Sequence, residues 1–323
     1  MTQTDATVDA DDAIDTGGFD IGPDNPAVHK SIWHDVFFTS QDGLRLYARD
    51  YPKVGGGAHV PILCLAGLTR NSKDFHTLAA RYAPRRRVIA LDYRGRGRSE
   101  YAKNWSTYSP LQEMKDVITL LAVLGVHKVI VMGTSRGGLI GMLMAAFSPT
   151  VLHGVILNDV GPEIEPRGLL RLKGYLGQIP DPKSWDDAAH MLRQTNKGFE
   201  NLSDAEWMAW AKRTYCAVNG KPVADYDTRL TRTFPSHEDI MEGRLPSLWP
   251  QFKAMSRNPV LTLRGEHSDL LTSETVETMR DMKPDMMFET VPNRGHVPFL
   301  DEPESLEAID EFLLRFGRDE EHA

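Results

Sequence analysis

The chain has 323 residues, of which 41% are hydrophobic and 25% are charged, and this composition excludes a fibrous or largely disordered protein. Its formal net charge of -8 argues against nucleic acid or an anionic membrane as the main partner. No apolar stretch approaches the roughly 20 residues of a membrane-spanning helix, and the first residues include no basic or apolar leader. The two cysteines have no metal-ligand spacing. We therefore expect a cytoplasmic protein without a membrane partner or a metal.

The N-terminal part of the chain divides into an acidic arm and a hairpin. Residues 1–28 carry seven aspartates and neither lysine nor arginine, which predicts a disordered arm. Two strand-like runs, 36–39 and 44–49, flank the turn signal Gln-Asp-Gly at 41–43. This pattern predicts two antiparallel strands.

From residue 60 onward, short apolar runs alternate with amphipathic segments. The expected strands are 60–65, 87–91, 128–132, 152–157, 260–263 and 287–291. The expected helices are 74–82, 111–124, 139–147, 273–282 and 303–316. This alternation predicts an α/β protein whose parallel sheet is covered by helices on both faces.

The alternation stops between residues 161 and 257. Helical spacing continues there without a strand signal, in the segments 167–176, 184–194 and 205–217. The insertion follows a sheet strand, at the edge of the sheet where ligand sites form, so we predict a helical cap over the site. The predicted organisation is an arm at 1–28, a core formed by 29–160 and 258–323, and a cap at 161–257.

The most informative motif is G-x-S-x-G at residues 133–137, with Ser135 at its centre. It lies between the expected strand 128–132 and the expected helix 139–147, the setting of a nucleophile elbow. Small residues on either side allow strand and helix to approach closely, so that the hydroxyl can project from a sharp turn. Ser135 is therefore the predicted nucleophile.

A serine hydroxyl needs a base to act as a nucleophile at neutral pH. His296 follows the last expected strand and precedes the final helix, so it belongs at the same sheet edge as Ser135. His267 is the alternative base, although an exposed loop histidine explains it adequately.

The acid that orients the base is expected in the loop after strand 260–263. Asp269 is the preferred residue, because it is short and is followed by apolar residues that could anchor the loop. Glu266 in the same loop and Asp159 after strand 152–157 are the alternatives.

With these residues the chain resembles the α/β-hydrolase superfamily, in its capped esterase-like branch. The resemblance covers about residues 31–317 and depends on the motif at 133–138, on the run L-D-Y-R-G-R-G-R-S at 91–99 and on Gly295-His296. The order Ser135, Asp269, His296 also matches the nucleophile, acid, base order of that fold. The resemblance implies a mostly parallel central sheet flanked by helices with an inserted helical cap. It also implies cofactor-independent serine hydrolysis of a small carboxylic ester or lactone through an acyl-enzyme.

The resemblance assigns further roles. It implies an oxyanion hole made by the backbone N–H groups of Leu68 and Arg136, and an architectural role for Asp92 and Arg94.

The side chains of Arg70 and Arg136 could bind a substrate carboxylate or pair with a nearby acid. Trp249, near the return to the core, could line the substrate pocket or pack the cap against the core.

Two other functions remain open. The same three residues could hydrolyse a carbon–carbon bond in a diketone ring-fission product, although the asparagine-bearing oxyanion loop of that branch is not evident at 66–71. The chain could also be a non-catalytic ligand-binding receptor of the same fold. In each case the expected partner is a small molecule.

Overall fold

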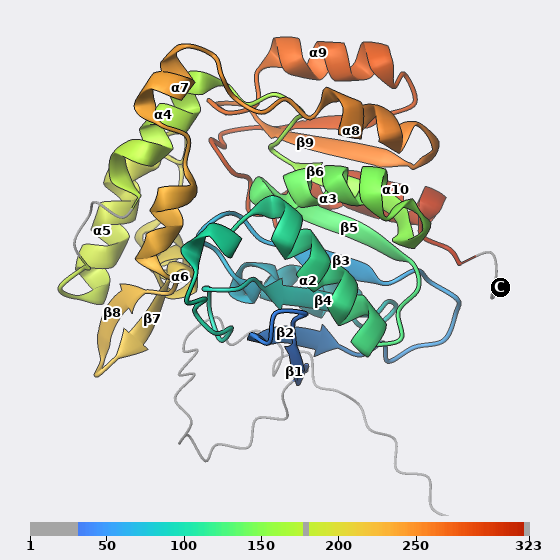
Figure 1. Ribbon diagram of the computed structural model, residues 1–323, viewed down its shortest axis with the longest axis horizontal. Helices are drawn as coiled ribbons and strands as arrows, with labels where there is room; N and C mark the ends of the chain where they lie inside the picture. Colours follow the sequence, from blue (N-terminus) through green and yellow to red (C-terminus); the bar gives the residue numbers. More distant parts are fainter. Residues whose placement is uncertain (1–31, 177–180, 320–323) are drawn as a thin grey trace, which may run out of the picture.

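The computed structural model describes residues 32–176 and 181–319, so the predicted arm at 1–28 lies outside the described residues. Its centre is an eight-stranded sheet with the order β1-β2-β4-β3-β5-β6-β9-β10 (Figure 1). The strands are β1 (His34–Thr39), β2 (Arg45–Tyr51), β3 (Ile62–Leu65), β4 (Val88–Asp92), β5 (Val129–Thr134), β6 (Leu152–Asn158), β9 (Val260–Gly265) and β10 (Met287–Val291). β2 pairs antiparallel with β1 and β4, and all other neighbours are parallel. The predicted mostly parallel sheet is confirmed.

Helices pack on this sheet as the alternation of the sequence predicts. They are α1 (His76–Tyr82), α2 (Pro110–Val123), α3 (Arg136–Phe147), α9 (Ser273–Met282) and α10 (Pro303–Phe316). α2 and α3 lie in front of the sheet in Figure 1, and α3 contacts β3, β5 and β6. Every residue of β3, β4 and β5 is buried, because helices and loops cover both faces of these strands, so each forms a continuous apolar run. No helix within 32–176 or 181–319 has the length and apolarity to cross a membrane.

The predicted boundaries shift at two helices. The predicted helix 74–82 is divided, with a 3₁₀ turn at Ser72–Phe75 before α1. The helix expected at 139–147 begins three residues earlier, at Arg136, directly after the motif serine. The N-terminal hairpin is present as predicted, and Gly43 in its turn has a φ of 86° that favours glycine.

The chain between β6 and β9, called here the cap segment (residues 161–257), is mainly helical. Its helices are α4 (Pro166–Tyr175), α5 (Trp185–Thr195), α6 (Asp204–Thr214), α7 (His237–Met241) and α8 (Trp249–Ala254). α4 to α7 lie to the left of the sheet in Figure 1, whereas α8 contacts α3 and so packs against the core.

One expectation in the cap segment is wrong: the predicted helix 205–217 is not continuous. α6 ends at Thr214, and the chain then forms an antiparallel hairpin of β7 (Tyr215–Val218) and β8 (Lys221–Ala224). Asn219 and Gly220 connect the strands with φ values of 51° and 77°. Asn-Gly with both φ values positive suits a tight two-residue hairpin turn, so this dipeptide was a signal for the hairpin.

An aromatic cluster joins the cap segment to the core. Phe199, Trp207 and Trp210 are buried together, and Phe299 from the loop after β10 packs against them. The ring centroids of Trp210 and Phe299 are 4.8 Å apart, and those of Phe199 and Phe299 are 5.3 Å apart. The cap segment is therefore anchored on the loop that carries His296.

Candidate active site

Ser135 lies at a strained turn between β5 and α3. Its φ of 50° and ψ of -110° are unusual for a residue with a Cβ atom, and such a conformation costs about 1–3 kcal/mol. The backbone N–H of Ser135 donates to the carbonyl of Asn158 over 3.0 Å, which holds the turn against β6. A Cβ atom on Gly137 would overlap the carbonyl oxygen of Leu65, so glycine is required where α3 approaches β3.

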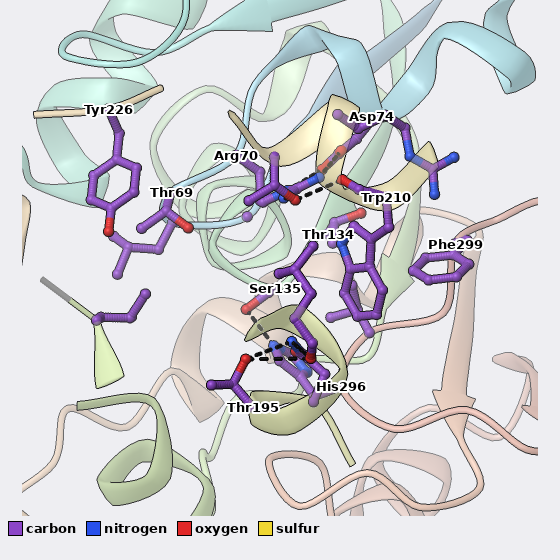
Figure 2. Close-up of a pocket in the computed structure, with 18 of the residues that line it drawn as sticks. Thr69, Arg70, Asp74, Thr134, Ser135, Thr195, Trp210, Tyr226, His296 and Phe299 are labelled. Atoms are coloured by element: carbon purple, nitrogen blue, oxygen red, sulfur yellow. Dashed lines mark hydrogen bonds and ion pairs between the residues drawn. The ribbon is translucent and has the colours of Figure 1, made fainter. Parts of the chain in front are cut away.

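His296 connects Ser135 to an aspartate. Its Nε2 atom is 3.0 Å from Ser135 Oγ, and its Nδ1 atom is 2.7 Å from Asp159 Oδ2 (Figure 2 shows the serine and the histidine). Because a carboxylate accepts, Nδ1 carries the proton and Nε2 is left to accept the serine O–H. This arrangement can convert a serine hydroxyl into a nucleophile.

Asp159 is fully buried, directly after β6, and its φ is 55°. Besides His296, two groups from the end of β9 and its loop hold the carboxylate. The N–H of Gly265 donates to Oδ1 over 2.9 Å, and the hydroxyl of Ser268 donates to Oδ2 over 2.7 Å. These three donors compensate the lost hydration of the buried charge and fix its orientation.

The structure corrects the expectation that Asp269 contacts His296. Asp269 instead forms a two-pronged ion pair with Arg171 of α4, over 2.5 Å and 2.8 Å. Desolvation alone would raise the pKa of Asp269, but the hydrogen bonds and charge of Arg171, together with a smaller charge interaction with His296, lower it overall. The end of β9 and the loop after it do reach the site, but they contribute the N–H of Gly265 and the hydroxyl of Ser268 to Asp159, whereas the loop's own carboxylate at Asp269 is taken by Arg171.

Glu266 and His267 lie away from the serine. Glu266 accepts the backbone N–H of Asn293 over 2.9 Å, and the side chains of Glu266 and His267 are both about half exposed. Neither is hydrogen-bonded to Ser135 or His296. Asp159, which the sequence favours less than Asp269, therefore occupies the expected position of the acid.

The two backbone groups expected to form an oxyanion hole have no hydrogen-bond acceptor within the described residues. Arg136 is the first residue of α3, where N–H groups have no partner inside the helix. Leu68 lies in the loop after β3 that lines the pocket around Ser135, and its carbonyl accepts Arg96 Nε over 2.8 Å. Both N–H groups therefore remain available to an anion, and their role as an oxyanion hole stays a prediction.

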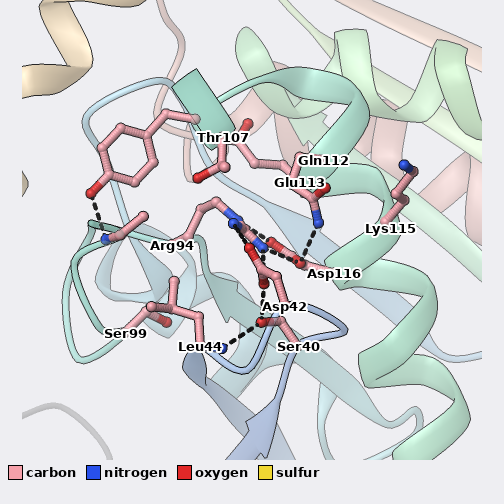
Figure 3. Close-up of polar contacts among 12 residues, drawn as sticks. Ser40, Asp42, Leu44, Arg94, Ser99, Thr107, Gln112, Glu113, Lys115 and Asp116 are labelled. Atoms are coloured by element: carbon pink, nitrogen blue, oxygen red, sulfur yellow. Dashed lines mark hydrogen bonds and ion pairs between the residues drawn. The ribbon is translucent and has the colours of Figure 1, made fainter. Parts of the chain in front are cut away.

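Two of the arginines around the elbow are architectural. The guanidinium of Arg136 pairs with the buried Glu113 over 2.8 Å and donates to the carbonyl of Tyr108 over 2.8 Å. Arg94 is fully buried and lies between Asp42 and Asp116, with contacts of 2.7 Å to 3.1 Å (Figure 3). These contacts agree with pairing of the Arg136 side chain to a nearby acid and with the architectural role expected of Arg94.

Asp92 is likewise held within the core. Its carboxylate accepts the backbone N–H groups of Ser72 and Arg98 over 2.7 Å and 2.9 Å. These bonds tie the end of β4 to the loops on either side, in agreement with the architectural role expected for this run.

A pocket of about 220 Å³ opens beside Ser135 and His296 (Figure 2). The core contributes the loop after β3, including Arg70, and the cap segment contributes side chains from α4, α5 and α6. Arg70 forms an ion pair with Asp74 and also donates to the hydroxyl of Thr214. Arg70 therefore lines the pocket, as a substrate contact requires, but the carboxylate of Asp74 already balances its charge.

Trp249 does not line this pocket, contrary to its prediction as a substrate contact. Its indole N–H donates to Glu163 over 3.2 Å, and its ring lies edge-on to Phe252 with centroids 6.1 Å apart. Trp249 is also partly buried against the main hydrophobic core, which agrees with its second predicted role, packing of the cap segment against the core. Trp210 lines the pocket instead, but its helical spacing from Trp207 could not distinguish a pocket residue from a core residue.

We therefore expect Trp249→Ala to change stability and not selectivity. The free energy of unfolding should fall by about 1–3 kcal/mol, because the substitution removes a partly buried ring. The ratio of kcat/KM values for short and long acyl esters should stay within twofold of the parent value. Thermal melts and ester kinetics measure the two effects, and Trp210→Ala is the comparison that should alter the ratio. A changed ratio in Trp249→Ala alone would contradict this assignment.

Comparisons with known proteins agree with the fold. Residues 62–309 match the model of the Alpha/beta hydrolase family. The chain is 33% identical over 275 residues to a 3-hydroxybutyrate-oligomer hydrolase of Cupriavidus necator. The aligned residues cover 83% of this chain and 93% of the relative. The crystal structure of an alpha/beta hydrolase from Novosphingobium aromaticivorans aligns with a TM-score of 0.80 and 39% identity, over 88% of this chain and 99% of that chain.

A more distant relative is a 2-(acetamidomethylene)succinate hydrolase of Mesorhizobium japonicum. It is 26% identical over 255 residues, which cover 78% of this chain and 87% of the relative. The chain belongs to the α/β-hydrolase family. It is an enzyme of the hydrolase class, as the names of these relatives indicate.

Proposed function

We propose that this protein is a cofactor-independent serine hydrolase that cleaves a small carboxylic ester through an acyl-enzyme. The observation that supports this most strongly is the position of His296, hydrogen-bonded to Ser135 on one side and to the buried Asp159 on the other. Hydrolysis of an ester requires a nucleophile and a proton carrier at the same place, and the hydrogen-bonded residues Ser135 and His296 supply both.

In the proposed mechanism, Ser135 Oγ attacks the ester carbonyl while His296 Nε2 takes its proton. Asp159 stabilises the imidazolium that forms, and the N–H groups of Leu68 and Arg136 stabilise the oxyanion. The tetrahedral intermediate collapses, and His296 returns the proton to the departing alcohol. Water then attacks the acyl-enzyme with His296 as the base, which releases the acid and restores Ser135.

The size of the pocket and the relatives guide the choice of substrate. A cavity of about 220 Å³ suits a short acyl or hydroxyacyl ester better than a long lipid chain. The relative from Cupriavidus necator is named for hydrolysis of 3-hydroxybutyrate oligomers, which are linear esters. Short 3-hydroxybutyrate esters are therefore the first substrates to test, and a lactone is open to the same chemistry.

The test is a panel of substrates given to the purified full chain. It contains 3-hydroxybutyrate dimer and trimer, p-nitrophenyl esters of two to eight carbons, a lactone and a diketone ring-fission product. At least one short ester should reach a kcat/KM on the order of 10⁴ M⁻¹ s⁻¹, and EDTA should not lower the rate, because the mechanism uses no metal. Cleavage of the diketone alone would overturn the ester proposal in favour of carbon–carbon hydrolysis.

A further inference from the structure

The pocket beside Ser135 is lined by two arginines whose charges are balanced differently. Arg70 Nε and Nη2 contact the two carboxylate oxygens of Asp74, and Arg70 Nη1 donates to Thr214. All its nitrogens thus have partners, and its charge is neutralised by a carboxylate four residues away. Arg70 is therefore a supporting residue of the pocket wall.

Arg213 lines the same pocket from the last turn of α6, and it is only partly exposed. Its guanidinium lies over the ring of Phe299, 5.1 Å from the centroid. Within 32–176 and 181–319 it has no hydrogen bond and no carboxylate at ion-pair distance. It is thus a cation held at the pocket with its donors unused.

Neither Asp301, which feels the charge of Arg213, nor Asp181, which lines the same pocket, forms an ion pair with Arg213. Desolvation raises the pKa of Asp301, and the charge of Arg213 opposes this rise from beyond ion-pair distance. Asp181, which also lines the pocket, is exposed and accepts the backbone N–H of Ala224 over 3.0 Å. The guanidinium of Arg213 thus has no hydrogen bond to either carboxylate.

The surroundings hold Arg213 in place relative to the reacting atoms. Arg70 donates to the hydroxyl of Thr214, the residue next to Arg213, and so fixes the end of α6. On the other side lies Phe299, three residues after His296 in the same loop. The guanidinium therefore extends from an anchored helix end and lies against the loop that carries the proposed base.

We propose that Arg213 binds a free carboxylate on the substrate, so that the preferred substrates are short esters of hydroxy acids with an ionised end. This inference rests on the proposed ester hydrolysis at Ser135. Arginine binds a carboxylate through two parallel N–H donors, and partial burial beside Phe299 strengthens such a pair relative to water. The carboxylate would supply the acceptor that the described residues do not provide.

The test compares two substrates that share one scissile bond. In 3-acetoxybutyrate and 3-acetoxybutanamide the acetyl ester is the same, and only the far end changes from an anion to a neutral amide. The parent enzyme should prefer the carboxylate by roughly 10–100-fold in kcat/KM, the range of a charge-assisted hydrogen bond. Arg213→Gln should lose this preference, with the rate on the amide within threefold of the parent.

Lys212→Gln is the matched control. Lys212 is the neighbouring residue on α6 and does not line the pocket. Its ammonium lies 3.8 Å from the ring centroid of Trp185. This variant loses the same charge, so a retained preference shows that net charge is not the cause. Arg213→Lys should keep part of the preference, because it keeps the charge without the planar fork.

The outcomes separate this inference from the proposed function. Equal kcat/KM values for the two substrates in the parent enzyme would overturn the role of Arg213 and leave ester hydrolysis standing. An unchanged preference in Arg213→Gln would do the same. No turnover of either substrate, together with no fluorophosphonate adduct on Ser135, would overturn the proposed function itself.

Discussion

Ser135→Ala should fold like the parent protein and lose ester turnover by on the order of 10⁴–10⁶ in kcat, because no other group supplies the nucleophile. Alanine is no bulkier than serine at this positive φ, so the turn between β5 and α3 should persist. The measurements are kcat for the preferred ester and the intact mass after treatment with a fluorophosphonate. The parent protein should gain one adduct and the variant none.

Ser106→Ala is the control for the nucleophile, because Ser106 is exposed on a 3₁₀ turn and, among the described residues, its hydroxyl is hydrogen-bonded only to Asn104. It should keep full activity and the single adduct. Labelling that persists in Ser135→Ala would mean that the nucleophile is another residue. A loss of the circular dichroism signal in that variant would instead show that the elbow serine supports the fold.

The core of the fold was predictable because its signals are local. Each buried strand is a short apolar run, and each helix has its own apolar face, so neither depends on distant residues for recognition. The motif at 133–137 likewise contains the glycines that its own turn requires, which explains why the position of Ser135 followed from the sequence. The hairpin of β7 and β8 does not follow from spacing, because the helical spacing of 205–217 continues past Thr214 into β7.

The site was only partly predictable because it depends on which side chains of different loops meet. His296 follows the last strand, and every parallel strand presents its following loop at one edge, so its approach to Ser135 could be expected. The acid depends on which of two loop carboxylates turns towards His296: Asp159 does so, whereas Asp269 pairs with Arg171 of α4. The sequence order does not contain this information. For the same reason, spacing could not show that Trp210 lines the pocket and Trp249 does not.

Asp159→Asn should lower kcat by about 10⁴ while changing KM little, because the base loses its orientation and the imidazolium loses its stabilising charge. Asparagine tolerates the φ of 55° at this position, and its amide oxygen can still accept one donor, so the fold should persist. The measurements are kcat and KM for the preferred ester, with a thermal melt to confirm folding.

Asp269→Asn is the decisive comparison, because Asp269 occupies the loop after β9 where the sequence alone placed the acid. Its carboxylate is paired with Arg171, so the substitution should loosen α4 against the core. Because an ion pair between partly exposed groups contributes little to stability, kcat should stay within about tenfold of the parent. A large fall in kcat for Asp269→Asn, with a mild effect of Asp159→Asn, would contradict the geometry. The hydrogen bonds that Gly265 and Ser268 donate to Asp159 would then have only a structural role, and the base would have to change its partner during turnover.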